Sequence, residues 1–408
     1  MKSATTSEPL HASTVWAYRL VLNREPNTLE AQAVDQKLDR TDRLIRSLIK
    51  SDEFATRLER PDFAEAELSP TEMRNAARWT FKLLLSREVG DEATLQAFVH
   101  GRRTLAELRR IVVFSDEFRV LNDKSLFPLL IAEVVRDFKP FPTNMGDSGS
   151  FKDFLGNTTR CSFLPPGMAA LSGGRQGPPG SNDNPPMHDV AEWIGTLRAA
   201  LDAKDRFVAV ELGAGWAPWL ISGRRAALLL GITEIHLLGV EGSLEHVQFM
   251  RQNFLDNGID PDLHQLIYGV VGVSDGVARF PVLSNPESNY GSAADYTKGE
   301  TSGEMIELPS FSLTKLLQNL PPIIDLIHCD IQGGEAEVMG ASLSTLRSRV
   351  RRVVIGTHGR KIEGELLEHF SSIGWKLEFE SVCTYRQDVS GHLALAIDGV
   401  QIWRNPDI

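Results

Sequence analysis

The strongest constraint on the fold is a regular alternation of strand-like and helix-like segments between residues 207 and 402. Apolar runs of strand length occur at 207–212, 235–241, 265–273, 323–330, 352–356, 375–381 and 393–402, and segments of helical period at 218–230, 243–256, 312–320 and 362–373. This alternation predicts an α/β fold with a mostly parallel sheet covered by helices on both faces. Ligands of such sheets bind beyond the carboxyl ends of the strands, so residues at those ends are the candidate site residues.

Charge and glycine are unevenly distributed along the 408 residues. Residues 1–140 hold 22 basic and 22 acidic side chains, so the net charge of 43 − 54 = −11 belongs entirely to residues 141–408. Of the 33 glycines, two fall in the first 140 residues. Because glycine is costly within helices and useful in tight turns, the front part is predicted to be helical and the body to be rich in turns.

Composition excludes several classes of protein. A net acidic chain without a basic tract is poorly suited to a phosphate backbone, so no nucleic-acid partner is expected. The three cysteines, Cys161, Cys329 and Cys383, are far apart and form no C-x-x-C pattern, which favours neither a disulfide framework nor a zinc site. The first residues lack the apolar core of a signal peptide, and no apolar run reaches about 18 residues. We therefore expect a cytoplasmic protein without a membrane span.

The front part contains an internal repeat. The segment 16–25 matches the segment 79–88, and the sequence Ser-Asp-Glu-Phe at 51–54 recurs at 115–118. Each copy predicts two helices joined by a polar turn, and two such hairpins can bury each other's apolar faces. Arg24 and Arg87 are expected to satisfy the last-turn carbonyls of their helices.

This repeat resembles a helical domain of unknown function found in many bacterial surface and secreted proteins, which is similar to phycobilisome linkers. The resemblance rests on short motifs and brings no catalytic residue with it. We expect residues 1–139 to form an all-α helical-hairpin repeat domain whose apolar helix faces dock onto a protein partner or onto a second copy of the chain as a homo-oligomer.

Residues 140–187 interrupt both patterns. Proline and glycine are so frequent here that neither a regular helix nor a central strand is expected. A connection of this length is either a linker or a functional lid, and we favour a lid that partly orders when ligand binds. The predicted organisation is thus an all-α domain at 1–139, a linker or lid at 140–187, and an α/β domain at 188–408.

The most informative motif follows the first predicted strand and reads Glu211-Leu212-Gly213-Ala214-Gly215-Trp216-Ala217-Pro218. The two glycines let the backbone approach a ligand closely, but Pro218 stands where a dinucleotide fold needs a third glycine. Glu211 would repel a pyrophosphate and suits a cationic ligand instead. Glu241 ends the second strand, where a carboxylate can bind both hydroxyls of a ribose. An adenosine-bearing cation such as S-adenosylmethionine satisfies both demands.

These features resemble the FkbM family of S-adenosylmethionine-dependent methyltransferases. The resemblance spans residues 187–405 and is carried by the loop 211–216, the Gly-Val-Glu at 239–241, the run from Asp325 to Glu335, and Thr357-His358. It implies a Rossmann-like seven-stranded methyltransferase sheet. It also implies methyl transfer to oxygen of a sugar, a saccharide-linked molecule or another small natural product.

The resemblance assigns roles to individual residues of the cofactor site. It places Glu211, Gly213 and Gly215 at the methionine part of the cofactor, Glu241 at the ribose, and Gly242 and Ser243 beside the adenine. Ala214 and Trp216 of the same loop are also expected at the cofactor, where Trp216 would stack on the ligand; a packing role beside the helix start is the alternative for Trp216. His328 departs from the family, which often has lysine at that position.

Two residues are candidates for the chemistry. Asp330 and His358 follow neighbouring predicted strands, where a base could take the proton of an acceptor hydroxyl. We favour His358, because histidine titrates in the useful range. The alternatives are a loop histidine bonded to a backbone carbonyl and, for Asp330, a carboxylate that caps the helix beginning near Gly334. With Glu335 these residues could hold a divalent cation, but so few ligands do not favour a metal.

The acceptor is expected to contact the segment 289–296, which contains Tyr290 and Asp295. This segment lies between a strand and the next helix, is polar and aromatic, and suits a hydroxylated ligand. An ordinary surface loop is the alternative interpretation.

Two other functions are weighed against methyl transfer. In the first, the chain is a non-catalytic binding or scaffold protein that uses the helical repeat and carries a degenerate methyltransferase body. The intact glycine loop and both strand-end acids speak against it. In the second, the chain is a nicotinamide-dependent oxidoreductase, which Pro218 and Glu211 disfavour.

Overall fold

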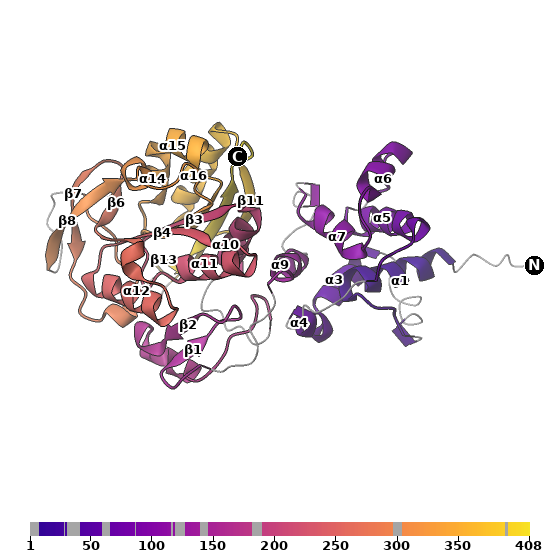
Figure 1. Cartoon of the computed structure of the whole chain (residues 1–408), viewed down its shortest axis with the longest axis horizontal. Coiled ribbons are helices and arrows are strands. Elements are labelled where there is room, and N and C mark those ends of the chain that lie inside the picture. Colours follow the sequence, from indigo (N-terminus) through magenta and orange to yellow (C-terminus); the bar gives the residue numbers. More distant parts are fainter. Residues whose placement is uncertain are drawn as a thin grey trace, which may run out of the picture. The chain divides into compact units, whose positions relative to one another are not determined.

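The computed structural model describes residues 8–27, 29–30, 41–58, 66–85, 87–115, 117–118, 127–138, 146–181, 190–296, 304–387 and 391–408. The chain divides into two compact units (Figure 1). The helical unit comprises residues 1–140 and 177–184, and the sheet unit comprises residues 141–176 and 185–408. In the described ranges, every helix is too short or too polar to cross a membrane.

The described part of the helical unit consists of helices α1 (Glu8–Leu22), α3 (Thr41–Ile49), α4 (Asp52–Leu58), α5 (Pro70–Leu84), α6 (Glu92–Val99), α7 (Leu105–Val113) and α9 (Phe127–Val135). Capping boxes begin α5 and α7, where Ser69 pairs with Glu72 and Thr104 with Glu107. The apolar faces of α1, α3, α5 and α7 pack together, and Leu20 is fully buried. The resemblance of this unit to the linker-like domains stays a prediction.

The two arginines of the repeat make equivalent ion pairs. Nη2 of Arg24 lies 2.6 Å from Oε2 of Glu53, and Nη2 of Arg87 lies 2.7 Å from Oε2 of Glu117. Both glutamates belong to the Ser-Asp-Glu-Phe segments. The expectation that these arginines satisfy last-turn carbonyls is therefore wrong, because a carboxylate binds the planar guanidinium through two parallel hydrogen bonds.

The sheet unit is built on one seven-stranded sheet of order β11-β14-β10-β9-β3-β4-β5. Its strands are β3 (Arg206–Leu212), β4 (Glu234–Glu241), β5 (Gln265–Tyr268), β9 (Leu326–Cys329), β10 (Arg352–Thr357), β11 (Lys376–Ser381) and β14 (Gly399–Arg404). β14 runs antiparallel between β10 and β11, and the other neighbouring pairs are parallel. The predicted fold class, an α/β chain with a Rossmann-like seven-stranded sheet, is confirmed.

Helices cover both faces of this sheet (Figure 1). One layer contains α10 (Val190–Asp202), α11 (Pro218–Leu229) and α12 (Leu244–Asp256), and the other contains α14 (Glu335–Ala341), α15 (Leu343–Arg349) and α16 (Arg360–Ser372). The short helix α13 (Leu313–Leu317) precedes β9. Because β3 is covered on both faces, its residues from Phe207 to Leu212 are all buried, which explains the continuous apolar run in the sequence.

Two predicted strands are interrupted in the structure. The segment 265–273 breaks at Gly269 into β5 and β6 (Val270–Gly272), and β6 joins β7 (Gly276–Pro281) and β8 (Met305–Ser312) in a separate sheet. A Cβ atom on Gly269 would lie 2.8 Å from both the Phe311 ring and the Pro309 carbonyl, so the chain turns where it has no side chain.

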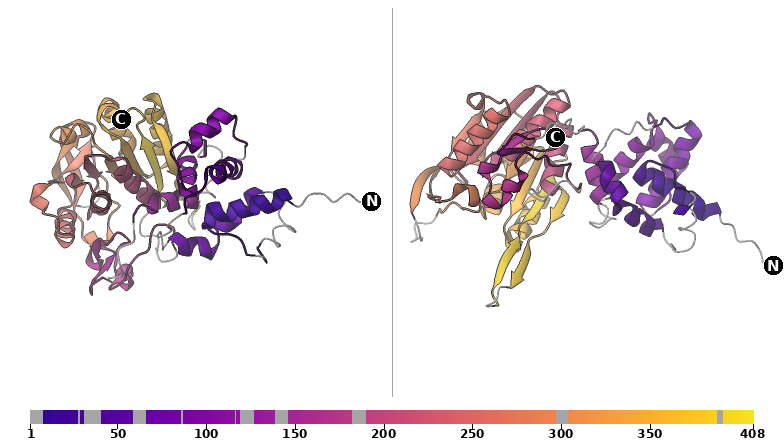
Figure 2. Two further views of the ribbon diagram at one scale, coloured as in Figure 1. Left: turned by 45° about the vertical axis from the view of Figure 1, so that its right-hand side comes forward. Right: turned by 90° about the horizontal axis from the view of Figure 1, so that it is seen from below.

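The segment 393–402 likewise divides into β13 (Leu393–Ile397) and β14. β13 pairs with β12 (Thr384–Gln387) in a hairpin that projects from the sheet unit (Figure 2). No periodicity in the sequence indicated β7, β8 or β12.

Residues 146–176 of the predicted linker or lid fold within the sheet unit. They form a hairpin of β1 (Ser150–Lys152) and β2 (Thr158–Arg160), followed by 3₁₀ turns at Cys161–Phe163 and Pro166–Leu171. The side chains of Phe151, Phe154 and Leu155 are at most 2% exposed and supply the apolar surface that holds this hairpin down. Residues 140–145 and 182–187 lie outside the described residues, and the domain boundaries at 139 and 188 stay predictions.

Candidate active site

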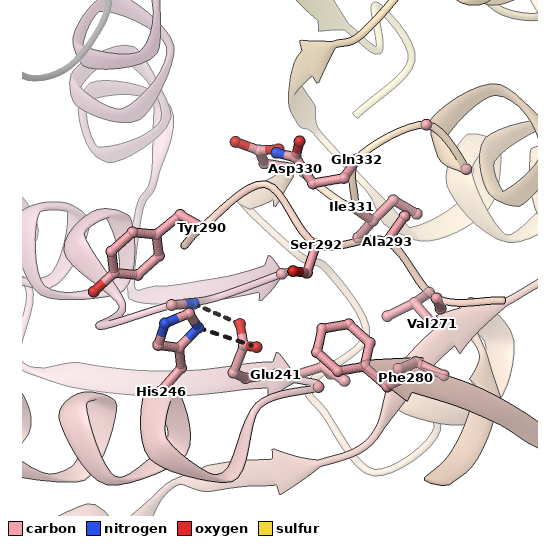
Figure 3. A pocket seen from close by; sticks show the side chains of 18 of the residues that line it. Glu241, His246, Val271, Phe280, Tyr290, Ser292, Ala293, Asp330, Ile331 and Gln332 are labelled. Atoms are coloured by element: carbon pink, nitrogen blue, oxygen red, sulfur yellow. Dashed lines mark hydrogen bonds and ion pairs between the residues drawn. The ribbon is translucent and has the colours of Figure 1, made fainter. Parts of the chain in front are cut away.

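A cavity of about 320 Å³ lies at the carboxyl ends of the central strands of the sheet unit (Figure 3). Its walls come from the loops after β3, β4 and β9, from β6 and β7, and from the segment 289–296. Predicted site residues that line it are Gly213, Gly215, Glu241, Gly242, Tyr290 and Asp330. Ligands of open α/β sheets bind at this edge, so the cavity is the candidate active site.

The glycine loop forms the floor of the cavity. Gly213 and Gly215 have φ angles of 74° and 53°, a left-handed conformation that favours glycine. A Cβ atom on Gly213 would collide with the carbonyl oxygen of Asp330, and one on Gly215 would lie 3.3 Å from the ring of Tyr290. Ala214 is buried, donates its N–H to the carbonyl of Val240 at 3.0 Å, and does not line the cavity.

Glu241 is the best-placed ligand-binding carboxylate. Its Oε2 accepts the backbone N–H of Gly215 and its Oε1 that of Ser243, both at 2.8 Å. Each oxygen retains a further lone pair for a ligand donor. Gly242 lines the cavity beside it, whereas Ser243 caps α12 by accepting the N–H of His246 at 3.3 Å.

Glu211 does not lie where the resemblance places it. Its carboxylate is 1% exposed and accepts the backbone N–H of Leu220 at 3.0 Å, at the start of α11. Burial raises its pKa to about 8. Because the carboxyl group is bonded to the backbone at the start of α11, the expected direct contact with a ligand ammonium does not fit the structure. Trp216 also lies outside the lining and packs its ring edge-on against Tyr290 at 4.7 Å.

His358 lies between two carboxylates. Its Nδ1 is 2.9 Å from Oε1 of Glu335 and its Nε2 is 3.3 Å from Oδ1 of Asp330. Burial lowers the pKa of His358, but the hydrogen bonds to Asp330 and Glu335 outweigh it and raise that pKa to about 10. An imidazolium has no lone pair to accept a proton, so the predicted role of general base does not fit His358.

Asp330 faces the cavity as an ionised group. Burial raises its pKa, but the hydrogen bond from His358 outweighs this and leaves the pKa below its usual value. Nε2 of Gln332 donates to Oδ1 of Asp330 at 2.7 Å. Asp330 does not cap α14, whose N-cap is Gly334 and which has no side-chain cap hydrogen bond. In the turn before α14, Glu335 accepts the backbone N–H groups of Ile331 and Gly333 at 3.2 and 3.0 Å.

The three candidate metal ligands do come together. One ligand atom each from Asp330, Glu335 and His358 lies within 4.8 Å of the others. However, Glu335 is fully buried and its carboxylate is occupied by backbone N–H groups and by the imidazole. The protonated imidazole of His358 already supplies a positive charge between the two carboxylates. A metal cation could bind His358 only by displacing the proton on Nε2, which faces Asp330.

The two predicted acceptor residues are separated. The ring of Tyr290 lines the cavity, and its hydroxyl donates a hydrogen bond to the carbonyl of Phe163. Asp295 does not line the cavity. Its carboxylate forms an ion pair with Arg279, and the backbones of the two residues form an antiparallel β-bridge.

Sequence reasoning missed His246, Phe280 and Gln332, which also line the cavity. His246 lies three residues after Ser243, so the helix-capping pattern after Glu241 could have found it. Phe280 comes from β7, which has no periodic signal in the sequence. Gln332 has a positive φ of 61° in the tight turn after β9.

A putative methyltransferase of Jannaschia sp. (strain CCS1) is 33% identical over 268 residues, which cover 63% of this chain and 93% of that protein. The matched 63% of this chain corresponds to about 257 of its 408 residues. The segment 188–408 contains 221 residues, so the match must also include residues before 188. No family model matches the chain.

Among solved structures, precorrin-6y C5,15-methyltransferase from Geobacter metallireducens GS-15 is 13% identical and covers 52% of this chain and 86% of its own, with a TM-score of 0.31. The ribosomal protein L11 methylase from Lactobacillus delbrueckii subsp. bulgaricus is 16% identical and covers 53% and 78%, with a TM-score of 0.28. The sequence relative decides the assignment, because nearly its whole length is matched at 33% identity. The chain therefore belongs to this methyltransferase family.

Proposed function

We propose that the sheet unit binds S-adenosylmethionine in the cavity and transfers its methyl group to a hydroxyl of a sugar, a saccharide-linked molecule or another small natural product. The observation that carries this proposal is Glu241, whose two oxygens are held by backbone N–H groups at the end of β4, beside a glycine floor. Such a carboxylate is suited to the two hydroxyls of a ribose.

The charges around the cavity fit a cationic cofactor. The acidic residues that line it are Glu241, Asp330 and Glu337, and no lysine or arginine occurs among its described lining residues. A sulfonium is favoured in such surroundings and a pyrophosphate is not. The volume falls within the usual range of about 300–1,000 Å³ for small-molecule sites. Because Gly213, Gly215 and Gly242 have no side chains, the adenosine and methionine parts of a bound cofactor can approach the backbone closely at these positions.

The residues of the chain have separate tasks in the proposed reaction. When bound, the cofactor supplies an activated methyl group, so alignment of the acceptor accounts for much of the rate. Asp330 is placed to accept the hydrogen bond of the acceptor hydroxyl and then its proton as the oxygen–carbon bond forms. His358 keeps Asp330 ionised and fixes its orientation. Because the pKa of Asp330 is low, it acts chiefly by orienting the hydroxyl.

The finer assignments are part of the same proposal. The run from Asp325 to Glu335 supports the FkbM family and hence oxygen as the methylated atom. We further propose that the protein acts in the cytoplasm, and that the helical unit docks onto a partner or a second copy of the chain.

The proposal is tested by incubating the protein with methyl-labelled S-adenosylmethionine and a panel of sugars, glycolipids and hydroxylated natural products. Label should appear as a methyl ether, and Asp330→Asn should lower turnover by about 10²-fold or more while the cofactor affinity stays near wild type. A mass-spectrometric comparison of cell-surface sugars with and without the gene identifies the acceptor in vivo. Methylation at nitrogen, or an Asp330→Asn variant of full activity, would overturn this mechanism.

A further inference from the structure

Residues 146–176 are attached to the layer of helices next to the cavity. The backbone N–H of Thr158 donates to Oδ1 of Asn257 at 2.8 Å, and Nδ2 of Asn257 donates back to the carbonyl of Thr158 at 2.9 Å. Two residues further along β2, Nε of Arg160 lies 2.5 Å from Oδ2 of Asp256, and its Nη2 lies 2.8 Å from Oδ1. The end of α12 and the hairpin β1–β2 are therefore held in register by paired hydrogen bonds.

Phe163 continues this attachment toward the cavity. Its side chain is 3% exposed and stacks on the ring of Phe249, with the ring centroids 5.0 Å apart. Its carbonyl oxygen accepts the hydroxyl of Tyr290. The position of Tyr290, on a segment without regular secondary structure, is thus fixed from a part of the chain that precedes the sheet.

Tyr290 in turn packs on His246 (Figure 3). The two rings are nearly parallel, at 6°, with centroids 4.3 Å apart. Nε2 of His246 donates to the carbonyl of Pro286 at 2.8 Å, and its Nδ1 faces Oε1 of Glu241 at 3.6 Å. A continuous series of contacts therefore runs from Phe163 through Tyr290 and His246 to Glu241.

We infer that Tyr290 and His246 are positioning residues for Glu241, and that residues 146–176 are thereby an integral part of the cofactor site. This inference rests on the proposed function, because it takes Glu241 as the ribose ligand. Tyr290 then serves cofactor binding with its ring, and its hydroxyl is committed to Phe163 and not to the acceptor. The match to the Jannaschia protein agrees with this, because it extends before residue 188.

The test is calorimetric titration of the full chain with S-adenosylhomocysteine. Tyr290→Phe keeps the ring and removes one hydrogen bond, so the affinity should fall by about 3- to 10-fold. His246→Asn should weaken binding at least as much. In both variants kcat at saturating S-adenosylmethionine should stay close to wild type while KM for the cofactor rises. A purely structural role would instead lower the unfolding temperature and leave KM unchanged.

Tyr18→Phe is the matched control, because it removes a buried tyrosine hydroxyl from the helical unit. Its affinity for S-adenosylhomocysteine should equal that of the wild type. The inference is overturned if Tyr290→Phe, shown by circular dichroism to be folded, binds as tightly as Tyr18→Phe. If the wild-type chain itself does not bind S-adenosylhomocysteine, the proposed function fails and the inference fails with it.

Discussion

Nδ1 of His358 lies 2.9 Å from Oε1 of Glu335, which is fully buried and held by backbone N–H groups of the turn after β9. The other nitrogen of the same ring faces Asp330 at 3.3 Å. The two contacts make His358 a fixed positive charge between two carboxylates, at the carboxyl ends of β9 and β10. In the proposed reaction it tunes and orients Asp330 and does not itself remove a proton.

The first prediction concerns the pH dependence of stability. The pKa of His358 rises from 6.5 to about 10 on folding, so its contribution is fully present below about pH 6.5 and is lost as the pH rises through 10. His358→Gln should lower the free energy of unfolding by about 3 kcal/mol at pH 6, because it leaves two carboxylates uncompensated. The difference in the free energy of unfolding between wild type and His358→Gln, measured by urea denaturation, should become smaller as the pH approaches 10.

His236→Gln serves as the control for this series, since His236 is an exposed histidine of the same sheet. This variant should change the free energy of unfolding only slightly, and the change should not decrease over the same pH range. A difference for His358→Gln that is constant from pH 6 to pH 10 would show that His358 is not held protonated.

The second prediction concerns the ribose contact. Glu241→Ala removes the carboxylate that we propose binds the ribose hydroxyls through charge-assisted hydrogen bonds, so the affinity for S-adenosylhomocysteine should fall by at least about 10- to 100-fold. Glu245→Ala is the matched control, because Glu245 lies four residues away on α12 and does not line the cavity. Equal affinities of the two variants would show that the ribose lies elsewhere.

The third prediction compares two glycines with similar backbone angles. Gly213 has φ 74° and Gly258 has φ 67°, so alanine costs about 1–2 kcal/mol of backbone strain at either position. A Cβ atom on Gly258 meets open space, whereas one on Gly213 collides with the carbonyl of Asp330. Gly213→Ala should therefore abolish cofactor binding, and Gly258→Ala should only reduce stability. Cofactor binding by a folded Gly213→Ala variant would show that the floor can shift.

The fourth prediction separates the units by truncation. A chain of residues 146–408 keeps the hairpin β1–β2 and should bind S-adenosylhomocysteine within about twofold of the full chain, because no described residue of 1–140 lines the cavity. A chain of residues 188–408 loses the contacts of Thr158, Arg160 and Phe163 and should bind much more weakly. Equal binding by both fragments would show that residues 146–176 are not part of the cofactor site.

The backbone features of the site could be predicted from the sequence. The apolar runs located the strands, and the glycines with Glu241 located the edge of the sheet at which the cavity lies, because strand ends and positive-φ turns have local sequence signals. Asp330 was placed correctly at the end of β9 for the same reason.

The side-chain partners could not be predicted in this way. The carboxylate of Glu211 turns to the start of α11, and Asp295 pairs with Arg279, although their positions in the sequence suggested ligand contacts. The protonation of His358 depends on Glu335, which lies 23 residues away in the sequence. Such contacts follow from the packing of separate segments, for which a single sequence carries no local signal.

The most direct test of the account is calorimetric titration of the full-length chain with S-adenosylhomocysteine. We predict one binding site per chain and an affinity that Glu241→Ala reduces strongly. No heat of binding at millimolar ligand from a folded protein would contradict the assignment of the cavity as a cofactor site.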